Sequence, residues 1–209
     1  MHQRILVIFA LLTYSLALSA QEAAPSDYNQ EISQHREYYK QEFLTNPRSP
    51  LRAQDTALLD FYPPDPNWRI QTRFERTPDA QPFDMQTYSG QTRKYVRYGI
   101  AYFEINGQPQ QLSLYQNLQL AKSEEYRDYL FLPFKDHTNG DSSYGGGRYL
   151  DLRTGEIGAD QVLILDFNKI YNPWCAYSDG YSCPIPPAEN HLELAVEAGE
   201  RNFLGEKKH

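Results

Sequence analysis

Two polar segments in the second half of the chain hold the side chains best suited to chemistry. In the first, FKDHTNGDSSYGGGRYLD, Arg148 stands between three glycines and an apolar stretch. An arginine at such a point can present its planar guanidinium to a carboxylate, which could be Asp136, Asp151, Asp166 or a group on a ligand. Ion-pair networks perturb the pKa values of ionisable groups just as active sites do, so such a residue pattern is not specific to a binding site. A structural arginine–aspartate pair is therefore the favoured interpretation. A ligand site at the Arg148 turn is the alternative.

The same segment carries oxygen atoms that could bind a hard cation. Asp136, Asn139, Asp141 and Asp151 are candidate ligands, but the alternating acids and distal glutamate of a calcium loop are absent. The run of three glycines suits a sharp turn, since neither a P-loop nor a dinucleotide pattern accompanies it. We therefore predict no metal site, and the sequence identifies no cofactor.

The second segment, DFNKIYNPWCAYSDGYSCPIPPAEN, covers residues 166–190. Asp166, Asn168 and Asn172 follow the apolar VLIL, so their polar groups would gather where a strand ends, which is a common place for a ligand. The competing interpretation is that they cap the backbone of the following loop. Four aromatic residues could form a pocket wall or a cover over the core: Tyr171, Trp174, Tyr177 and Tyr181.

Patterns typical of catalysis are scarce. The chain contains no GxSxG or HExxH, and its five histidines are scattered, which leaves His137 and His191 as isolated acid–base candidates. Asp136 and Asp166 could serve a hydrolase as acid and base if folding brought them together in a cleft. The catalytic residues stay unassigned, and whether the chain is an enzyme stays open.

The elements that must position these residues are mostly strands. Period-two alternation predicts eight of them, and the Asn-Gly pair between the third and fourth predicts a tight hairpin turn. The stretches are WRIQTRF, FDMQT, RKYVRYGIAYFEI, QLSLYQN, DYLFLPF, RYLDL, VLILDFN and HLELAVEA. This spacing favours a mainly β fold, an antiparallel barrel or sandwich of about eight strands.

A helix is predicted ahead of the strands, with Ser26 or Asp27 as its N-cap and Asn46-Pro47 as its stop. Its apolar residues share one face, which should pack on the sheet: Tyr28, Ile32, Tyr39 and Phe43. A second short helix is expected to begin near Ser49-Pro50. We expect a single domain over residues 26–205 and an exposed tail over residues 206–209.

The first twenty residues have the layout of a cleavable secretory signal. Arg4 precedes an apolar run from Ile5 to Leu18, which is short for a bilayer span, and cleavage is expected after Ser19 or Ala20. We expect a linker over residues 21–25 and an exported protein, periplasmic or extracellular, with a retained anchor as the alternative. The net charge of −7 argues against nucleic acid or an anionic membrane as a partner.

Cys175 and Cys183 are the only cysteines of the chain. In an oxidising compartment a disulfide is the simplest expectation, and its loop of about nine residues would contribute roughly 2.6 kcal/mol. A thiolate metal site and a reactive pair are the alternatives, but CxxC spacing and a matching histidine pattern are absent.

Long stretches of the chain carry a family resemblance. FLPFKDHTNGDSSYGGGRYLDL and LDFNKIYNPWCAYSDGYSCPIPPAENHLELAVEAGE, together with FYPPDPNWRI and YGIAYFEINGQPQQLSLY, resemble the family catalogued as domain of unknown function 1684. The resemblance implies no activity, substrate or cofactor. It does imply which positions form the family's motif: Asp136, Thr138, Gly140, Tyr144, Gly147, Arg148, Tyr149, Asp166, Asn168, Tyr171, Asn172, Pro173, Cys175, Cys183, Pro184, Pro187, Asn190 and Glu200.

These observations lead to one functional hypothesis and two alternatives. We expect a small polar or anionic ligand to bind in a pocket framed by the Arg148 turn and the 166–190 loop. The candidate ligand-binding residues are Asp136, Thr138, Tyr144, Arg148, Asp166, Asn168, Asn172 and Asn190. The alternatives are a hydrolase that uses Asp136 and Asp166, with or without a metal, and a protein-interaction module with a tyrosine-rich face. The oligomeric state is not predicted.

Overall fold

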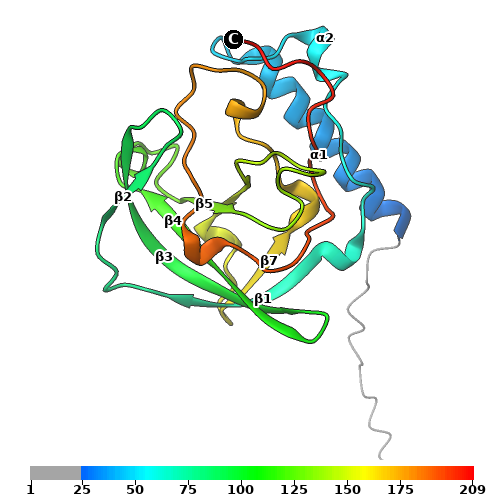
Figure 1. The fold of residues 1–209 in the computed structure, drawn as a ribbon. Helices are drawn as coiled ribbons and strands as arrows, with labels where there is room; N and C mark the ends of the chain where they lie inside the picture. The colour runs from blue at the N-terminus through cyan, green and yellow to red at the C-terminus, as the bar shows by residue number, and fades with distance from the viewer. Residues whose placement is uncertain (1–24) are drawn as a thin grey trace, which may run out of the picture.

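The computed structural model describes residues 25–209, and the expected signal segment, residues 1–20, lies outside them. Seven antiparallel strands form one sheet that curls into a half-barrel, and α1 (Pro25–Thr45) lies alongside it (Figure 1). The mainly β fold with an N-terminal helix is therefore confirmed. The strands are β1 (Arg69–Arg76), β2 (Phe83–Gln86), β3 (Thr92–Ile105), β4 (Gln108–Asn117), β5 (Tyr129–Phe134), β6 (Arg148–Arg153) and β7 (Val162–Asp166).

The strands lie in the order β6-β5-β4-β3-β1-β7, with β2 beside β3. β6 and β7 follow one another in the chain, yet they occupy opposite ends of this order and do not pair with each other. β7 pairs with β1 instead, which sets Arg69 opposite Asp166. Because the sheet curls, both of its end strands border a single cleft beside α1.

Local sequence explains how β3 and β4 join and bend. Asn106 and Gly107 both have positive φ, 52° and 74°, as a type I′ turn requires, so the predicted hairpin is confirmed. The β3–β4 register shifts between Arg97 and Gly99, which is the mark of a bulge and bends the strand. A Cβ atom at Gly99 would lie 2.2 Å from the Phe74 ring, so only glycine lets β1 approach so closely.

Alternation along the strands separates two apolar layers. On β5 and β6, Leu130, Leu132, Leu150 and Leu152 enter the main core. Phe131 and Tyr149 alternate with these leucines along the strands. They join a second layer with three further buried residues of the sheet, Met85, Tyr95 and Tyr115. This second layer is buried and rich in tyrosine, and the alternation places the side chain of Asp151 on the same side of the sheet.

α1 confirms the predicted helix and its buried face. Tyr28, Ile32 and Phe43 are at most 5% exposed, and Tyr39 packs edge-on against Phe43. The helix begins at Pro25, so Ser26 and Asp27 lie in its first turn and neither is the N-cap. The second helix, α2 (Ala53–Thr56), begins later than predicted. Within residues 25–209 no helix has both the length and the apolar character to cross a bilayer.

The prediction of an eighth strand at HLELAVEA was wrong. Leu192, Val196 and Ala198 do enter the main core, but the segment forms only an isolated bridge between His191 and Lys135 and no strand. The backbone carbonyls of Val196 and Ala198, which a sheet would use in its ladder, accept hydrogen bonds from Arg148. The first half of the segment still bonds to the backbone of Lys135 and His137, whereas in the second half the buried cation takes the place of a neighbouring strand.

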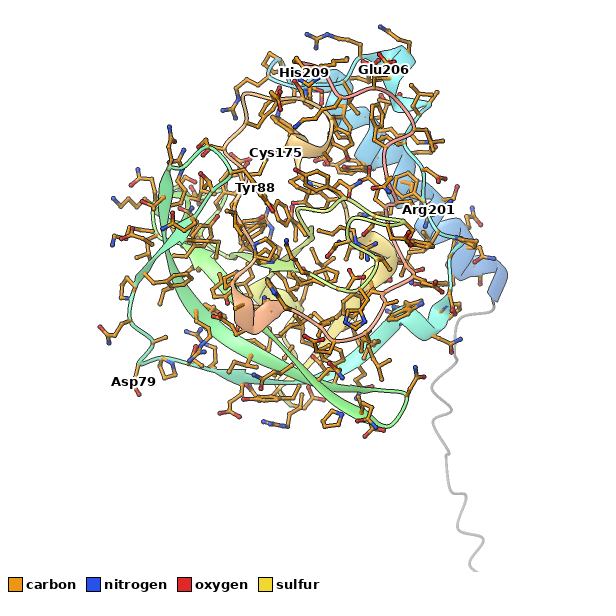
Figure 2. The ribbon with its side chains drawn as sticks, in the orientation of Figure 1. Asp79, Tyr88, Cys175, Arg201, Glu206 and His209 are labelled. Atoms are coloured by element: carbon orange, nitrogen blue, oxygen red, sulfur yellow. A yellow bond between two sulfur atoms is a disulfide. The ribbon has the colours of Figure 1, made fainter. Side chains whose placement is uncertain are left out.

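The C-terminal residues are bonded to the domain. The Lys208 N–H donates to the Tyr177 carbonyl at 2.9 Å, and the Asp179 N–H donates to the Lys208 carbonyl at 2.8 Å. The Lys208 ammonium also contacts Asp55 in α2, and the segment lies beside α2 in the view with side chains (Figure 2).

Candidate functional site

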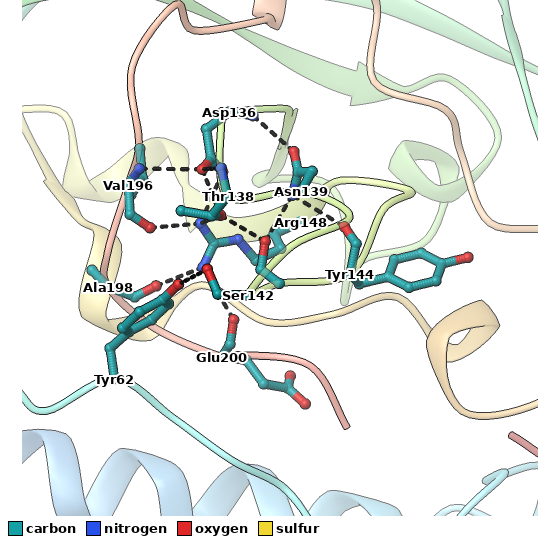
Figure 3. A network of polar contacts seen from close by, with 11 residues as sticks. Tyr62, Asp136, Thr138, Asn139, Ser142, Tyr144, Arg148, Val196, Ala198 and Glu200 are labelled. Carbon is teal, nitrogen blue, oxygen red and sulfur yellow. Dashed lines mark hydrogen bonds and ion pairs between the residues drawn. The ribbon is translucent and has the colours of Figure 1, made fainter. Parts of the chain in front are cut away.

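Arg148 lies at the centre of an enclosed polar network (Figure 3). Its side chain is fully buried, and its Nη2 donates to Asp136 Oδ2 at 2.8 Å and to Thr138 Oγ1 at 3.1 Å. Asp136 in turn accepts from the N–H and the hydroxyl of Thr138. Three carbonyl oxygens also accept from the guanidinium: Val196 from Nη2 at 2.7 Å, and Ala198 and Glu200 from Nη1 at 2.7 and 3.0 Å. The guanidinium thus holds the C-terminal segment against β6.

Glu200 links this network to α1. Its carboxylate is fully buried and accepts from the Tyr177 hydroxyl at 2.6 Å, the Tyr39 hydroxyl at 3.1 Å and the Asn172 N–H at 2.8 Å. Burial raises the pKa of Glu200 from 4.5 to about 7, and these hydrogen bonds offset part of that effect. Tyr39 comes from α1, so the helix is bonded directly to a titratable group of the interior.

Asp166 and Asn168 form a second cluster where β7 ends. Asp166 Oδ1 accepts from the Tyr28 hydroxyl of α1 at 2.9 Å and from the Asn168 N–H at 3.1 Å. The Asn168 amide also exchanges two hydrogen bonds with the backbone of Asp65, both 2.9 Å long. Asp166 Oδ2 is enclosed and has no hydrogen-bond partner in the described part of the chain, and Lys169 Nζ is 3.8 Å from it.

Asn190 bridges β4 and β5 where a proline interrupts the hydrogen bonds of the sheet. The register that sets Tyr115 opposite Phe131 places Ser113 opposite Pro133, which has no N–H to donate. The fully buried Asn190 side chain donates to the carbonyls of both residues, at 2.8 and 2.7 Å, and accepts from the Ser113 N–H at 2.7 Å. A side-chain amide thus stands in for the missing peptide group between β4 and β5.

The remaining candidates are held apart from one another. Asn172 donates from its amide to the Arg201 carbonyl at 2.7 Å, whereas Tyr144 is half-buried with its ring directed away from Arg148 (Figure 3). The predicted disulfide joins Cys175 and Cys183, whose Cα atoms are 6.2 Å apart. Asp136 and Asp166, the pair considered for acid–base chemistry, share no partner and belong to separate clusters.

A cleft of about 640 Å³ lies between α1 and the two end strands of the sheet. We call it the edge cleft. α1 contributes His35, Tyr38, Tyr39, Glu42 and Phe43 to its lining, Asn46 follows directly after the helix, and β6 contributes residues 150–153. The rest of the lining consists of Arg69, Glu156, Ile164, Asp166, Lys169, Tyr171 and Trp174. Of the eight candidate residues only Asp166 lines it, and Arg148 does not.

Asp151 is the best-positioned polar group of the edge cleft. Its Oδ1 accepts from the hydroxyls of Tyr129 and Tyr171, each at 2.7 Å, while Oδ2 has no hydrogen-bond partner within residues 25–209. The side chain keeps contact with solvent through the cleft, but protein surrounds it elsewhere. This desolvation raises the pKa of the Asp151 carboxyl above its usual range, although the two hydroxyls lower it.

Glu42 of α1 lines the same cleft. Burial raises the pKa of Glu42, and the nearby negative charge of Asp151 raises it further. At the other end, burial and then the charge of Lys169 lower the pKa of His35, which is therefore neutral at pH 7.

The sequence singled out Asp151 only as a partner for Arg148 or as a cation ligand, and it did not single out Glu42. The signal for Asp151 was present in RYLDLR, where the carboxylate shares a strand face with Tyr149 while leucines occupy the other face. Glu42 gave no such signal, because an acidic residue on an exposed helix position is ordinary.

Comparisons with known proteins agree with the fold. The family described as "Protein of unknown function (DUF1684)" matches residues 55–201, a range that ends before the tail and begins after α1. The solution NMR structure of an uncharacterised protein from Haloarcula marismortui is 32% identical, covers 84% of this chain and 95% of that one, and has a TM-score of 0.65. No curated protein matches the chain. The chain therefore belongs to the DUF1684 family.

Proposed function

We propose that this protein binds a small polar ligand in the edge cleft, with Asp151 as the principal acceptor. The observation that carries the proposal is the fixed geometry of that carboxylate: two tyrosine hydroxyls hold Oδ1 and leave Oδ2 without a partner. An acceptor that is already oriented loses little entropy when a ligand binds, and a charged acceptor forms the stronger class of hydrogen bond. The cleft volume of about 640 Å³ is typical of small-molecule sites.

A thermal-shift screen against polar metabolites tests this proposal. A ligand at about a hundred times its dissociation constant adds about 2.7 kcal/mol to the unfolding free energy, which is an easily measured shift. Asp151→Asn should abolish the shift while the protein stays folded, because an asparagine oxygen can still accept from both tyrosines. Asp79→Asn, on a loop far from α1 (Figure 2), is the matched control. A ligand whose shift survives Asp151→Asn would disprove the site.

We further propose that the protein acts outside the cytoplasm. The apolar run from Ile5 to Leu18 and the disulfide of Cys175 with Cys183 support this. Cell fractionation with thiol labelling tests it. Export predicts blocked cysteines in the periplasmic or extracellular fraction, and a cytoplasmic protein with two free thiols would refute it.

A further inference from the structure

Two acidic side chains of the edge cleft have no basic partner. Asp151 and Glu42 face the cleft from β6 and α1, and neither forms an ion pair within residues 25–209. The negative charge of Asp151 raises the pKa of Glu42, so the repulsion between the two charged carboxylates is a cost in free energy. A positive charge between them would remove that cost.

Two basic side chains of the cleft form ion pairs with carboxylates that do not line it. Arg153 Nη1 bonds Asp128 at 2.7 Å, and Lys169 Nζ bonds Glu31 at 2.6 Å. Arg69 has no such partner in the described residues, but it lies opposite Asp166 in the β1–β7 ladder. None of these basic side chains forms an ion pair with Asp151 or Glu42 in the described residues, although the charge of Arg153 lowers the pKa of Asp151.

A second carboxylate of the cleft lining is incompletely hydrogen-bonded. Asp166 is 6% exposed and lines the same cleft, yet its enclosed Oδ2 accepts no hydrogen bond. Buried carboxylate oxygens are normally bonded, so this atom leaves a strong acceptor unused. Because Asp166 Oδ2 is enclosed and lies 3.8 Å from the Lys169 ammonium, the unused acceptor that the cleft exposes is Oδ2 of Asp151.

Aromatic rings line the cleft near Asp151. The Tyr39 ring lies 5.0 Å from that of Phe43 and 5.7 Å from that of Tyr171, and Trp174 lies 6.5 Å from Phe43. All four line the cleft. The faces of such rings carry partial negative charge, and they attract ammonium and guanidinium groups.

We infer that the ligand of the edge cleft is an organic cation, whose ammonium or guanidinium group binds between Asp151 and Glu42 against this aromatic wall. The inference rests on the proposed function and adds the chemical class of the ligand. Charge, hydrogen-bond acceptors and ring faces then all favour the same kind of group.

Calorimetric titrations with matched probes test the inference. The probes are putrescine against butanediol and choline against its uncharged carbon isostere. We expect the cationic member of at least one pair to bind at least about ten-fold more tightly than its neutral counterpart, as charge-assisted bonds require. Glu42→Gln and Asp151→Asn should each weaken that binding about ten-fold. Glu37→Gln, on the same helix and paired with Lys40 outside the cleft, should leave it unchanged.

Each outcome of these titrations is decisive. If neutral probes bind as well as cations and Asp151→Asn weakens both, the polar-ligand site stands and the inference fails. If cations bind but both cleft variants bind them equally well, the cations bind elsewhere and the inference fails. If neither the probes nor the metabolite screen gives binding, the proposed function fails as well.

Discussion

Arg148 and Glu200 are joined through the backbone and not through their charges. The guanidinium donates to the Glu200 carbonyl oxygen at 3.0 Å, whereas the Glu200 carboxylate points away from it toward α1 (Figure 3). The arginine is neutralised by Asp136, and the glutamate is held by two tyrosines and a backbone N–H. Two buried ionisable groups therefore lie close together with separate roles, and substitutions should distinguish them.

Replacing Arg148 should destabilise the whole domain. Arg148→Met leaves the Asp136 charge buried without a partner, which typically costs about 3 to 5 kcal/mol. Urea unfolding measures this loss. Arg201→Met, which breaks a partly exposed pair with Asp60, is the matched control and should cost no more than about 1 kcal/mol. Equal losses in the two variants would contradict the structural role.

Glu200 should make stability depend on pH. Its pKa is raised in the folded state, so the folded protein holds a proton that the unfolded chain releases between pH 4.5 and about 7. The stabilising contribution is complete below pH 4.5 and is lost as the pH rises through about 7, in total about 3 kcal/mol. The difference in unfolding free energy between wild type and Glu200→Gln should fall across that range. An equally steep slope for the exposed-site variant Glu197→Gln would contradict this assignment.

Asn190 should matter for stability although it touches no ligand site. Asn190→Leu leaves the Ser113 N–H and two carbonyl oxygens buried without partners, which we expect to cost at least about 2 kcal/mol in chemical denaturation. The control is Asn202→Leu, which removes an exposed amide with one hydrogen bond to the Asp141 carbonyl. A loss no larger than that of the control would show that the amide does not bridge the strands.

Removing the disulfide should weaken the loop that it closes. The sequence separation of 8 between Cys175 and Cys183 corresponds to a stabilisation of roughly 2.6 kcal/mol in the chain-entropy account. The double variant Cys175→Ser with Cys183→Ser should lose about this amount in urea, and reductant should lower wild type to the same level. If reductant also destabilised the double variant, the loss of stability in reduced wild type could not be assigned to the disulfide.

The sequence predicted the fold well because its signals were local. Alternation located β1 to β7, and the Asn106-Gly107 pair located the hairpin. HLELAVEA shows where such reasoning fails: its apolar residues alternate as in a strand, but a buried arginine binds its carbonyls. No local pattern reveals a partner that lies so far away in the chain.

The candidate site was harder to predict for the same reason. Most of the polar residues selected from the sequence, such as Asn168 and Asn190, replace backbone partners in the interior. The Asp151 carboxylate is oriented by hydrogen bonds from Tyr129 and Tyr171, which belong to β5 and to the segment after β7. A cleft between the two ends of a curled sheet exists only after the sheet has formed.

The hydrogen bonds of Arg148 join residues that are synthesised at different times. Its carbonyl acceptors lie 48 to 52 residues further along the chain, so the arginine leaves the ribosome well before they do. Until that segment is synthesised, Asp136 and Thr138 are the only protein acceptors of this network that can take hydrogen bonds from the guanidinium. A chain that stops before Val196 lacks all three carbonyl acceptors, so it cannot complete the buried network around Arg148.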